Sequence, residues 1–420
     1  MKRATIILSG MIAAEPWQGG ATWAVLQYIL GFRQLGHEVF FIEPIQPKAL
    51  RPAGNPLADS ENADYFRQVA DGFGFRGQSA LLLADTRETF GLSYEQLKEV
   101  AQRADVLINI SGMLTDETLT ASIPVRVYLD LDPAFNQLWQ DVQKIDMRFA
   151  GHTHHVTIGQ NIGVNSRSSR REEAHSKFPD PRPQTPDPKM SEPPHVGCYE
   201  EENCPVPTCG LNWLKTFQPL VLEHWPVARE IKHDALTTIA HWRGYGSIEH
   251  QGVTYGQKVH SLRQFFSLPT LTPEKFLLAL AIHPAETKDL AALAANRWSL
   301  ADPACVANTP ARYREFIQGS KAEFGLAKSG YVHSRCGWFS DRSVCYLASG
   351  RPVIAQDTGF RRRLPTGEGL FVFNGADDVL HAIDAMNSDY AKHAARARAI
   401  AVEYFDSDKV LARLLLNLGL

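Results

Sequence analysis

The sequence lacks a long apolar segment, a dense set of cysteines and an excess of basic residues. No stretch reaches the ~20 apolar residues that a membrane-spanning helix needs. Six cysteines in 420 residues are too few for a disulfide framework, which indicates a reducing, cytoplasmic setting. Lys and Arg total 43 against 46 Asp and Glu, and no run concentrates them, so the sequence predicts no nucleic-acid partner. A peripheral contact with a membrane surface stays open.

The first residues admit two interpretations. "MKRATIILSGMIAAEP" has the basic start, apolar run and small residues of a secretory signal. The same residues also fit a core strand, "ATIILSGMI", because "GGATWAVLQYILGFRQLGHEVFFIE" continues with a glycine-rich loop, a helix and a second strand. Without the first strand this helix would have no sheet to cover, so we favour the strand.

Strands and helices alternate along most of the chain, which predicts an α/β fold with doubly wound parallel sheets. Because 420 residues exceed one ordinary core, we expect two domains. These are an N-terminal Rossmann-like domain over 1–225 and a C-terminal Rossmann-like domain over 226–395. We expect a C-terminal helix over 396–420 to pack back on the first domain. Residues 164–203 are rich in proline, serine and charge and predict a disordered insertion.

Two serines mark predicted helix starts. Ser93 precedes "YEQLKEVAQRA" and has Gln96 three residues on, which is the pattern of a capping box. Ser407 precedes the last amphipathic segment, "DKVLARLLLNLGL", and is the expected N-cap of that helix.

Cationic residues follow a predicted strand in the second half of the chain. "TTIAHW" leads to Arg243 in a glycine-rich turn, and Lys258 begins the next helix. Ligands of open α/β sheets bind outside the carboxyl ends of the strands. A guanidinium and an ammonium at one such end suit a diphosphate. Taken without other evidence, the two residues could equally belong to solvated loops that bind no ligand.

The stretch "SRCGWFSDRSVCYLASGRPVIAQDTGF" offers further groups to a phosphate. Ser340 is the expected N-cap of a helix, whose free N–H groups and partial positive charge attract anions. Gly337 permits close approach of the backbone, and Arg335 adds a full charge. Thr358 and Gly359 follow the next strand. Taken by itself, the stretch fits a capped helix without a ligand equally well. The two cations upstream favour the interpretation as a phosphate-binding site.

The first half offers a loop and two carboxylates. Gly19, Gly20 and Thr22 form a loop and helix start that we expect to face the cleft between the domains. Asp130 and Asp132 end the strand "VRVYL", where a carboxylate can accept a proton from an acceptor hydroxyl or hold a sugar. Capping of the turn before a proline is the alternative role for this pair.

Histidines cluster in "GHTHHVTIG". If this segment is extended, His152 and His154 share one face and His155 takes the other. An imidazole titrates near neutral pH, so His154 is a candidate base. No carboxylate or cysteine completes a metal site locally, and we predict no metal.

The cysteines do not offer a convincing site. Cys345 falls on the apolar face of a predicted helix, so we interpret it as a small core residue rather than a nucleophile. A second group of His and Cys residues matches no paired Cys-x-x-Cys spacing, so we interpret it as a chance grouping and not as a zinc site. It comprises His195, Cys198, Cys204 and Cys209.

Taken in order, these segments resemble a known family. Residues 312–373 are similar to the nucleotide-sugar-binding half of glycosyltransferases with the GT-B fold, and "CGWFS" resembles the donor motif of plant secondary-metabolite glycosyltransferases. The N-terminal glycine-rich loop and the pair Arg243 and Lys258 resemble the loop and diphosphate clamp of such enzymes. The resemblance implies two Rossmann-like domains facing across a cleft, in a bacterial-type hexosyltransferase. It would transfer sugar from a nucleotide-diphospho-sugar, bound by the second domain, to an acceptor hydroxyl held by the first.

The sequence departs from this family at two positions. Many retaining members have glutamates where Cys345 and Gly337 stand here, so ribose and sugar contacts must come from elsewhere. Asp357 and Glu368 are the candidates. Because cations and N–H donors would stabilise the leaving diphosphate, we expect no obligatory metal or other cofactor.

The missing glutamates keep other functions open. A GT-B-fold epimerase or phosphorylase would act on the same donor class. A non-catalytic protein that binds a sugar nucleotide is the third possibility. The acceptor, the sugar and the base, the stereochemical outcome and the oligomeric state do not follow from the sequence.

Overall fold

The computed structural model describes residues 3–163 and 204–420. The predicted insertion, with His195 and Cys198, lies outside the described residues. The first half of the chain builds an eight-stranded sheet of order β4-β3-β2-β1-β5-β6-β7-β8. Its strands are β1 (Thr5–Ser9), β2 (Glu38–Ile45), β3 (Ser79–Leu83), β4 (Thr89–Gly91), β5 (Val106–Ile110), β6 (Val125–Asp130), β7 (His154–Thr157) and β8 (Trp213–Lys215). Strand β4 runs antiparallel to β3, and the other neighbours are parallel.

The second half builds a six-stranded parallel sheet of order β13-β12-β9-β14-β15-β16. Its strands are β9 (His233–His241), β12 (Phe276–Ala281), β13 (Ser299–Ala301), β14 (Ser320–Gly325), β15 (Val353–Gln356) and β16 (Leu370–Phe373). A small antiparallel pair, β10 (Ile248–His250) and β11 (Val253–Tyr255), follows β9. Numbered within itself, the second sheet has the order 3-2-1-4-5-6 of a Rossmann unit, and β3 to β7 of the first sheet follow the same order without β4. This confirms the predicted α/β class with two doubly wound units.

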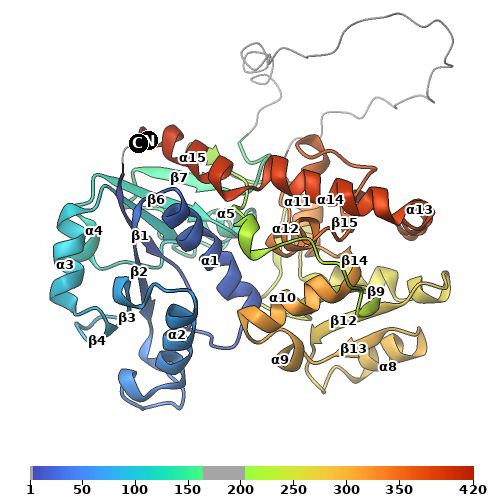
Figure 1. The fold of residues 1–420 in the computed structure, drawn as a ribbon, viewed down its shortest axis with the longest axis horizontal. Coiled ribbons are helices and arrows are strands. Elements are labelled where there is room, and N and C mark those ends of the chain that lie inside the picture. The colour runs from blue at the N-terminus through green and yellow to red at the C-terminus, as the bar shows by residue number, and fades with distance from the viewer. Residues whose placement is uncertain (1–2, 164–203) are drawn as a thin grey trace, which may run out of the picture.

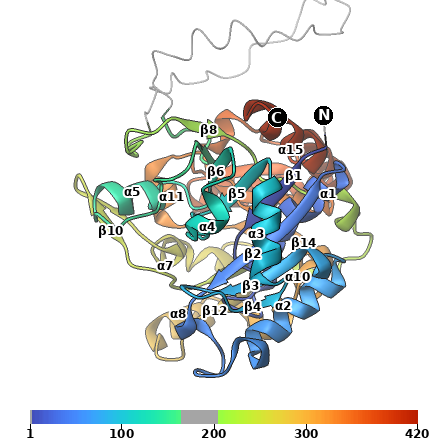
Figure 2. The same ribbon diagram turned by 90° about the vertical axis from the view of Figure 1, so that its left-hand side faces the viewer.

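Helices lie around both sheets (Figures 1 and 2). In the first half they are α1 (Gly19–Gln34), α2 (Glu61–Gly72), α3 (Tyr94–Arg103), α4 (Glu117–Thr120) and α5 (Phe135–Asp141). Then come α7 (Lys258–Leu262), α8 (Thr287–Ala295), α9 (Pro303–Val306), α10 (Pro310–Gly319), α11 (Ser329–Ser334) and α12 (Asp341–Ala348). The last three are α13 (Ala376–Ser388), α14 (Tyr390–Tyr404) and α15 (Ser407–Asn417). None of the described helices is both long and apolar enough to cross a bilayer.

Strand β1 lies in the interior of the first sheet, as the strand interpretation of the N-terminal residues predicts. Its side chains alternate between two cores. Ile6 and Leu8 join the cluster that contains α1 and α2, whereas Ile7 joins the cluster that contains α3. Burial on both faces explains the nearly continuous apolar sequence of this strand.

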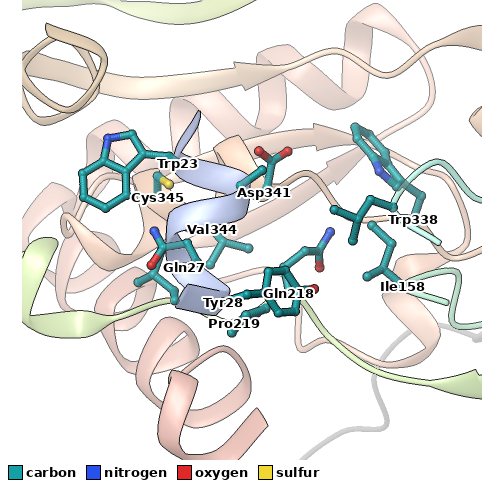
Figure 3. Close-up of a pocket in the computed structure, with 13 residues that line it drawn as sticks. Trp23, Gln27, Tyr28, Ile158, Gln218, Pro219, Trp338, Asp341, Val344 and Cys345 are labelled. Atoms are coloured by element: carbon teal, nitrogen blue, oxygen red, sulfur yellow. The ribbon is translucent and has the colours of Figure 1, made fainter. Parts of the chain in front are cut away.

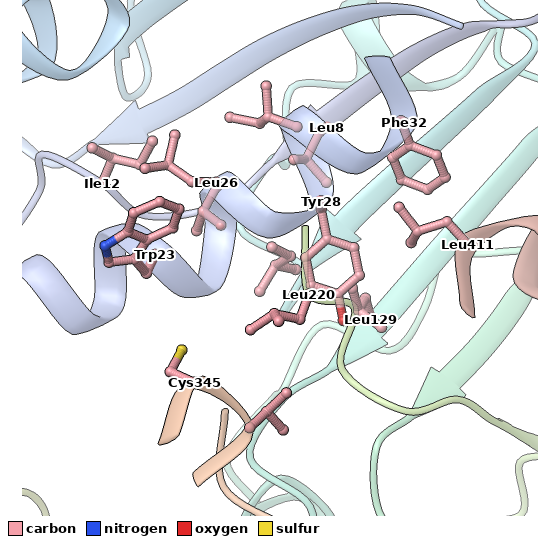
Figure 4. Close-up of a cluster of buried hydrophobic side chains, with 14 of the residues drawn as sticks. Leu8, Ile12, Trp23, Leu26, Tyr28, Phe32, Leu129, Leu220, Cys345 and Leu411 are labelled. Carbon is pink, nitrogen blue, oxygen red and sulfur yellow. The ribbon is translucent and has the colours of Figure 1, made fainter. Parts of the chain in front are cut away.

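Helix α1 is buried on nearly all sides (Figure 4). Toward the first sheet it packs in the same cluster as the buried side chain of Leu8. Toward the second unit, the indole of Trp23 donates to the backbone carbonyl of Pro310 at 2.8 Å. Near its other end, a Cβ on Gly31 would lie 2.6 Å from Leu411 Cδ1 of α15. Since three neighbours cover it, α1 has the apolar circumference of a core helix.

The last three helices run from the second unit back to the first, in red in Figure 1. Helix α14 packs on α12, and α15 packs on α1. The backbone N–H of Ser407 donates to Leu220 O at 2.9 Å, which ties the start of α15 to the segment after β8. The C-terminal helices therefore connect the second unit to the first.

The two serine predictions have different outcomes. Ser93 caps α3 and forms the complete capping box with Gln96. The N-cap of α15 is Asp406 rather than Ser407, because the Asp406 carboxylate accepts the backbone N–H of Asp408 at 3.1 Å. The helix thus begins one residue earlier than the serine pattern predicts.

Glu43 of β2 fixes the loop that leads from β1 toward α1. Its fully buried carboxylate accepts backbone N–H groups of Ile12 at 2.9 Å, Ala13 at 2.8 Å and Ala14 at 2.6 Å. Burial raises the pKa of Glu43 to about 7, although the three donors favour its ionised form. One side chain thereby holds the backbone of a loop that has no regular structure of its own.

We predict that Glu43→Ala lowers the free energy of unfolding by at least about 2 kcal/mol, since each unpaired buried N–H costs about 1–3 kcal/mol. Denaturant unfolding followed by circular dichroism measures this loss. Glu38→Ala, on the same strand, is the control. Glu38 pairs with the half-exposed Arg103, and such a pair contributes about 1 kcal/mol or less. Equal losses in both variants would contradict the role of Glu43.

Candidate functional site

A cavity of about 510 Å³ lies between the two units and is called the interunit cavity here. The first unit lines it with the loop before α1, the first residues of α1 and Arg51. The second unit lines it with the ends of β9 and β12, residues around α9, Tyr313 of α10, and the first residues of α7 and α12. Its position beside the end of β9 matches the switch point of a Rossmann sheet, where the strand order reverses between β9 and β14.

Lys258, the first residue of α7, lines the interunit cavity. Within the described residues its ammonium has neither a hydrogen bond nor an ion pair. Burial lowers the pKa of Lys258 well below its usual value, and the positive charges of Arg342 and Lys328 lower it further. The carboxylates of Glu323 and Asp341 offset part of this effect. An unpaired amine at such a cavity attracts anions.

Arg342, in the first turn of α12, contributes the second cation. Its Nε donates to Glu323 Oε1 at 2.6 Å, and its Nη1 donates to Ile239 O at 3.0 Å. The remaining Nη2 is buried and has no hydrogen-bond partner among the residues that the structure describes. Glu323 holds the guanidinium in place and offsets its charge, so Lys258 supplies the uncompensated charge.

His241 ends β9 and also lines the cavity. Partial desolvation lowers the pKa of its imidazole, and the charge of Lys258 adds to the effect. His241 is therefore mainly neutral near pH 7 and is able to accept a proton. The start of α12 contributes partial positive charge, because the N–H groups of its first turn have no partner inside the helix.

Arg243 does not line the interunit cavity. Its half-exposed guanidinium forms an ion pair with Glu286 at 2.5 Å, and the hydrogen bonds to Glu286 raise its pKa. Of the two cations that follow β9 in the sequence, the structure therefore brings Lys258 to the cavity and ties Arg243 to a neighbouring helix.

The predicted phosphate cradle after α11 is filled by a residue of the first unit. Asn161 donates its side-chain amide to Arg335 O at 2.8 Å and to Gly359 O at 3.3 Å. A Cβ on Gly337, which has φ +78°, would lie 3.0 Å from Asn161 Cγ. The Thr358 hydroxyl donates to Trp338 O. These groups make a contact between the units and do not line the cavity.

Ser340 is the N-cap of α12, as expected, but its side chain makes no capping hydrogen bond. The two residues that follow it, Asp341 and Arg342, reach the cavity. The helix start, rather than the serine hydroxyl, thus faces the space that a ligand would occupy.

The two acidic candidates for ribose or sugar contacts lie elsewhere. Asp357 is buried and pairs with Arg361 at 3.1 Å and Arg335 at 3.5 Å, so it holds the loop after β15. Glu368 is half-exposed and pairs with Lys392 of α14 at 2.7 Å. Neither lines the interunit cavity, and these ion pairs give both carboxylates a structural role.

The N-terminal glycine loop meets the second unit directly. The backbone N–H of Gly19 donates to Ala307 O at 3.1 Å. A Cβ on Gly20 would lie 2.8 Å from the Tyr313 ring, and Gly20 lines the cavity. The Thr22 hydroxyl shares a hydrogen bond with Tyr65 OH at 2.8 Å and faces the core instead. Both glycines are therefore needed for the close approach of the units.

Asp130 has the contacts of a structural residue. Its fully buried carboxylate accepts hydrogen bonds from Asn136 at 2.7 Å, Thr157 at 2.8 Å and Gln137 at 2.9 Å. It also accepts the backbone N–H of Asp132 at 3.0 Å. Burial raises its pKa to about 6. With four donors around it, Asp130 shapes the turn after β6, and it does not line the interunit cavity.

Asp132 joins the two units. It accepts hydrogen bonds from Tyr245 OH at 2.7 Å and from Tyr331 OH, and it pairs with Lys328 Nζ at 3.3 Å. Burial lowers the pKa of Lys328 even though Asp132 favours its charged form. The Lys328 ammonium also lies 4.2 Å from the centroid of the Tyr245 ring. These contacts hold the carboxyl end of β6 against α11.

The histidine cluster is arranged differently from the extended-strand prediction. Strand β7 begins only at His154, so His152 lies in the preceding turn. The rings of His152 and His155 are 6.3 Å apart, while His154 bonds Thr153 Oγ1 at 2.9 Å. Within residues 3–163 and 204–420, no three His, Cys, Asp or Glu side chains are arranged to hold a metal ion.

Burial disfavours the thiolate form of three described cysteines, Cys204, Cys209 and Cys345. Cys345 is 4% exposed, as its predicted core position requires. Burial raises the pKa of both Cys204 and Cys209 to about 11, so their thiols stay protonated at neutral pH.

Sequence reasoning missed Arg342, His241 and Glu43 as residues of the site or its support. Arg342 had a signal, because it is a charged residue in an otherwise buried helix. His241 stands at the end of "TTIAH", next to the strand end that the sequence identified. Glu43 had none, since its three partners lie about 30 residues away in an irregular loop.

The unpaired Lys258 is predicted to cost stability. Lys258→Met is expected to raise the free energy of unfolding near neutral pH, because it removes a charge that burial disfavours. A lysine with a lowered folded-state pKa gives stability that is present above its unfolded value of about 10.4 and is lost as the pH falls. The advantage of Lys258→Met should therefore shrink as the pH rises toward that value.

Thermal unfolding of both proteins across this pH range measures the difference. Lys275→Met is the control, since Lys275 is exposed and its ion pair with Asp234 is 3.9 Å long. A destabilised Lys258→Met at neutral pH would contradict an uncompensated charge at this position.

Comparison with known proteins shows the fold. No family model matches the chain, and no curated protein matches it in sequence. Solved structures do match over the full length. An alpha-glucosyltransferase in complex with UDP and a 13-mer DNA containing a HMU base is 11% identical, with a TM-score of 0.57 over 100% of both chains. Anabaena HepE in complex with UDP-glucose is 11% identical, with a TM-score of 0.55 over 99% of this chain and 100% of that one. The chain has the GT-B glycosyltransferase fold, with two Rossmann-like units facing each other.

Proposed function

We propose that the protein is a glycosyltransferase that takes sugar from a nucleotide-diphospho-sugar and transfers it to an acceptor hydroxyl. The observation that carries the proposal is the convergence of Lys258, Arg342 and the first turn of α12 on the interunit cavity. Two solved structures of the same fold contain UDP or UDP-glucose, which supports this donor class. The acceptor stays undefined.

In this proposal the diphosphate lies beside Lys258. The ammonium, the free Nη2 of Arg342 and the helix start donate hydrogen bonds to phosphate oxygens. Negative charge grows on the leaving diphosphate as the glycosidic bond breaks, so donors fixed in advance stabilise the transition state more than the ground state. The Glu323 carboxylate keeps Arg342 oriented throughout.

The rest of the interunit cavity suits the nucleoside. Asp302, Pro303 and Ala304 follow β13, and Tyr313 projects from α10. They place an aromatic ring and small apolar groups within the same cavity as the cations, which fits a nucleobase. In this assignment the second unit, from about residue 226, binds the donor, and the first unit presents the acceptor.

His241 is the group that we assign as proton acceptor in the cavity, because its lowered pKa keeps it neutral. Asp132 takes a positioning role, since its three partners hold the units together. Asp130 and His154 take no part in this scheme, because the contacts of both tie them to their own unit.

A non-catalytic protein that binds a sugar nucleotide is the second candidate. The replacement of carboxylates by Cys345 and Gly337 favours it. Incubation with UDP-glucose, and with other sugar nucleotides, over a panel of hydroxyl acceptors separates the possibilities. A glycosylated product supports the transferase, isomerised donor without acceptor supports an epimerase, and tight binding without turnover supports the non-catalytic alternative.

Binding of nucleoside diphosphates tests the cavity. We expect UDP or another nucleoside diphosphate to stabilise the wild type by about 2.7 kcal/mol at a hundredfold excess over its dissociation constant. Lys258→Met should weaken binding about 10- to 100-fold, the equivalent of a charged hydrogen bond of about 1.5–3 kcal/mol. Arg243→Ala, the matched control, should bind nearly as the wild type does. A larger loss in Arg243→Ala than in Lys258→Met would refute this placement.

Proton uptake gives an independent test. A bound diphosphate raises the lowered pKa of Lys258, so this amine takes up a proton when the diphosphate binds. Titration calorimetry of UDP in two buffers of different ionisation enthalpy, at mildly alkaline pH, measures the net uptake. We expect uptake in the wild type, less in Lys258→Met, and an affinity that falls as the pH rises. Proton release on binding would show that the assignment is wrong.

A further inference from the structure

A second cavity, called the side pocket here, lies between α1 and α12 (Figure 3). Its volume of about 170 Å³ resembles that of a cavity of about 150 Å³ that binds benzene, so it admits a single ring. Asp341 lines both the side pocket and the interunit cavity. A ligand with its diphosphate at Lys258 can therefore place an adjoining ring in the side pocket.

The walls of the side pocket are apolar, but α1 brings two buried polar groups to it. The Tyr28 hydroxyl has no hydrogen-bond partner among residues 3–163 and 204–420, although the residue is only 2% exposed. Burial and the nearby Asp341 carboxylate raise its pKa, so it remains a donor. Buried polar groups without partners are rare in native proteins and call for an explanation.

Gln27 supplies the second group, and its orientation is fixed. The backbone N–H of Val221 donates to Gln27 Oε1 at 2.8 Å, so the carbonyl end of the amide faces Val221. The Nε2 end is buried, since only 5% of the residue is exposed, and its N–H groups have no partner in the part of the chain that the structure describes. Both Gln27 and Tyr28 line the side pocket.

Asp341 completes a donor and acceptor set. Within the described residues its carboxylate makes no hydrogen bond or ion pair, and Figure 3 shows it with the side chains of α1 around one space. A sugar hydroxyl both accepts and donates. It can accept from Tyr28 or Gln27 and donate to Asp341, while Trp23 and Trp338 cover the apolar face of a ring.

We propose that the side pocket binds the hydroxyl-bearing ring of the sugar nucleotide through Tyr28, Gln27 and Asp341. This inference rests on the proposed function. It gives the chain a hydroxyl-recognition site that compensates for Cys345 and Gly337, where the resembling enzymes have carboxylates. The ring is either the ribose or the transferred sugar, which share this chemistry.

Tyr28→Phe is the sharpest variant, because it removes only the hydroxyl. In the free protein its melting temperature should equal or exceed that of the wild type, since an unpaired buried hydroxyl stabilises nothing. Tyr128→Phe is the matched control. Tyr128 is also fully buried with an unpartnered hydroxyl, but it does not line the side pocket. Asp341→Asn tests the acceptor side.

Calorimetric titrations with UDP-glucose, UDP and inorganic pyrophosphate separate the possible sources. GDP-mannose with GDP, and ADP-glucose with ADP, serve as further pairs. We expect Tyr28→Phe to weaken the binding of UDP-glucose about three- to tenfold. The affinity for pyrophosphate, which has no ring, should stay unchanged. If the binding of UDP is weakened equally, the pocket holds the ribose. If only the binding of UDP-glucose is weakened, the pocket holds the transferred sugar.

Wild-type affinities in Tyr28→Phe and Asp341→Asn for every sugar nucleotide would overturn the inference while leaving the donor site intact. Weakening of the same size in Tyr128→Phe would also overturn it, since the effect would then be general. If the wild type binds pyrophosphate but none of the nucleotides, the proposed function itself fails, and the inference fails with it.

Discussion

The packing of α1 between the two units is the constraint on which the rest of the structure depends. One side of the helix covers the first sheet. The Trp23 indole donates a hydrogen bond to Pro310 O at the start of α10, and α15 packs closely against Gly31. A single buried cluster consequently runs from β1 through α12 to α15. The same helix begins at the interunit cavity and presents Gln27 and Tyr28 to the side pocket. The position of α1 therefore determines the walls of both cavities.

Electrostatics divides the cations of the second unit into two kinds. Arg243 has a carboxylate partner, and Arg342 is held by Glu323. Lys258 has no hydrogen bond or ion pair within the described chain, although Glu323 and Asp341 lie near it as well as Arg342 and Lys328. A paired cation supports the fold, but an unpaired one costs stability that only an anion restores. This difference, rather than the number of basic residues, distinguishes a binding site from a solvated surface.

The order of elements could be predicted from the sequence because strand and helix periodicity are local. The position of Lys258 also followed from local pattern, since the residue begins the first helix after β9, beyond the β10–β11 pair. The surroundings of Arg335 and Gly359 did not, because Asn161 bonds their carbonyls across 174 and 198 positions in the chain. Arg243 likewise gains Glu286 by folding. Local sequence shows which groups stand at strand ends, whereas distant partners decide which of them stay available to a ligand.

The central claim is that the diphosphate of a sugar nucleotide binds at Lys258 between the two units. A crystal structure of the protein grown with UDP tests it most directly. We expect a phosphate oxygen within about 3.2 Å of Lys258 Nζ, with the nucleoside in the interunit cavity near Tyr313. A diphosphate bound beside Arg243, or anywhere outside the interunit cavity, would contradict it.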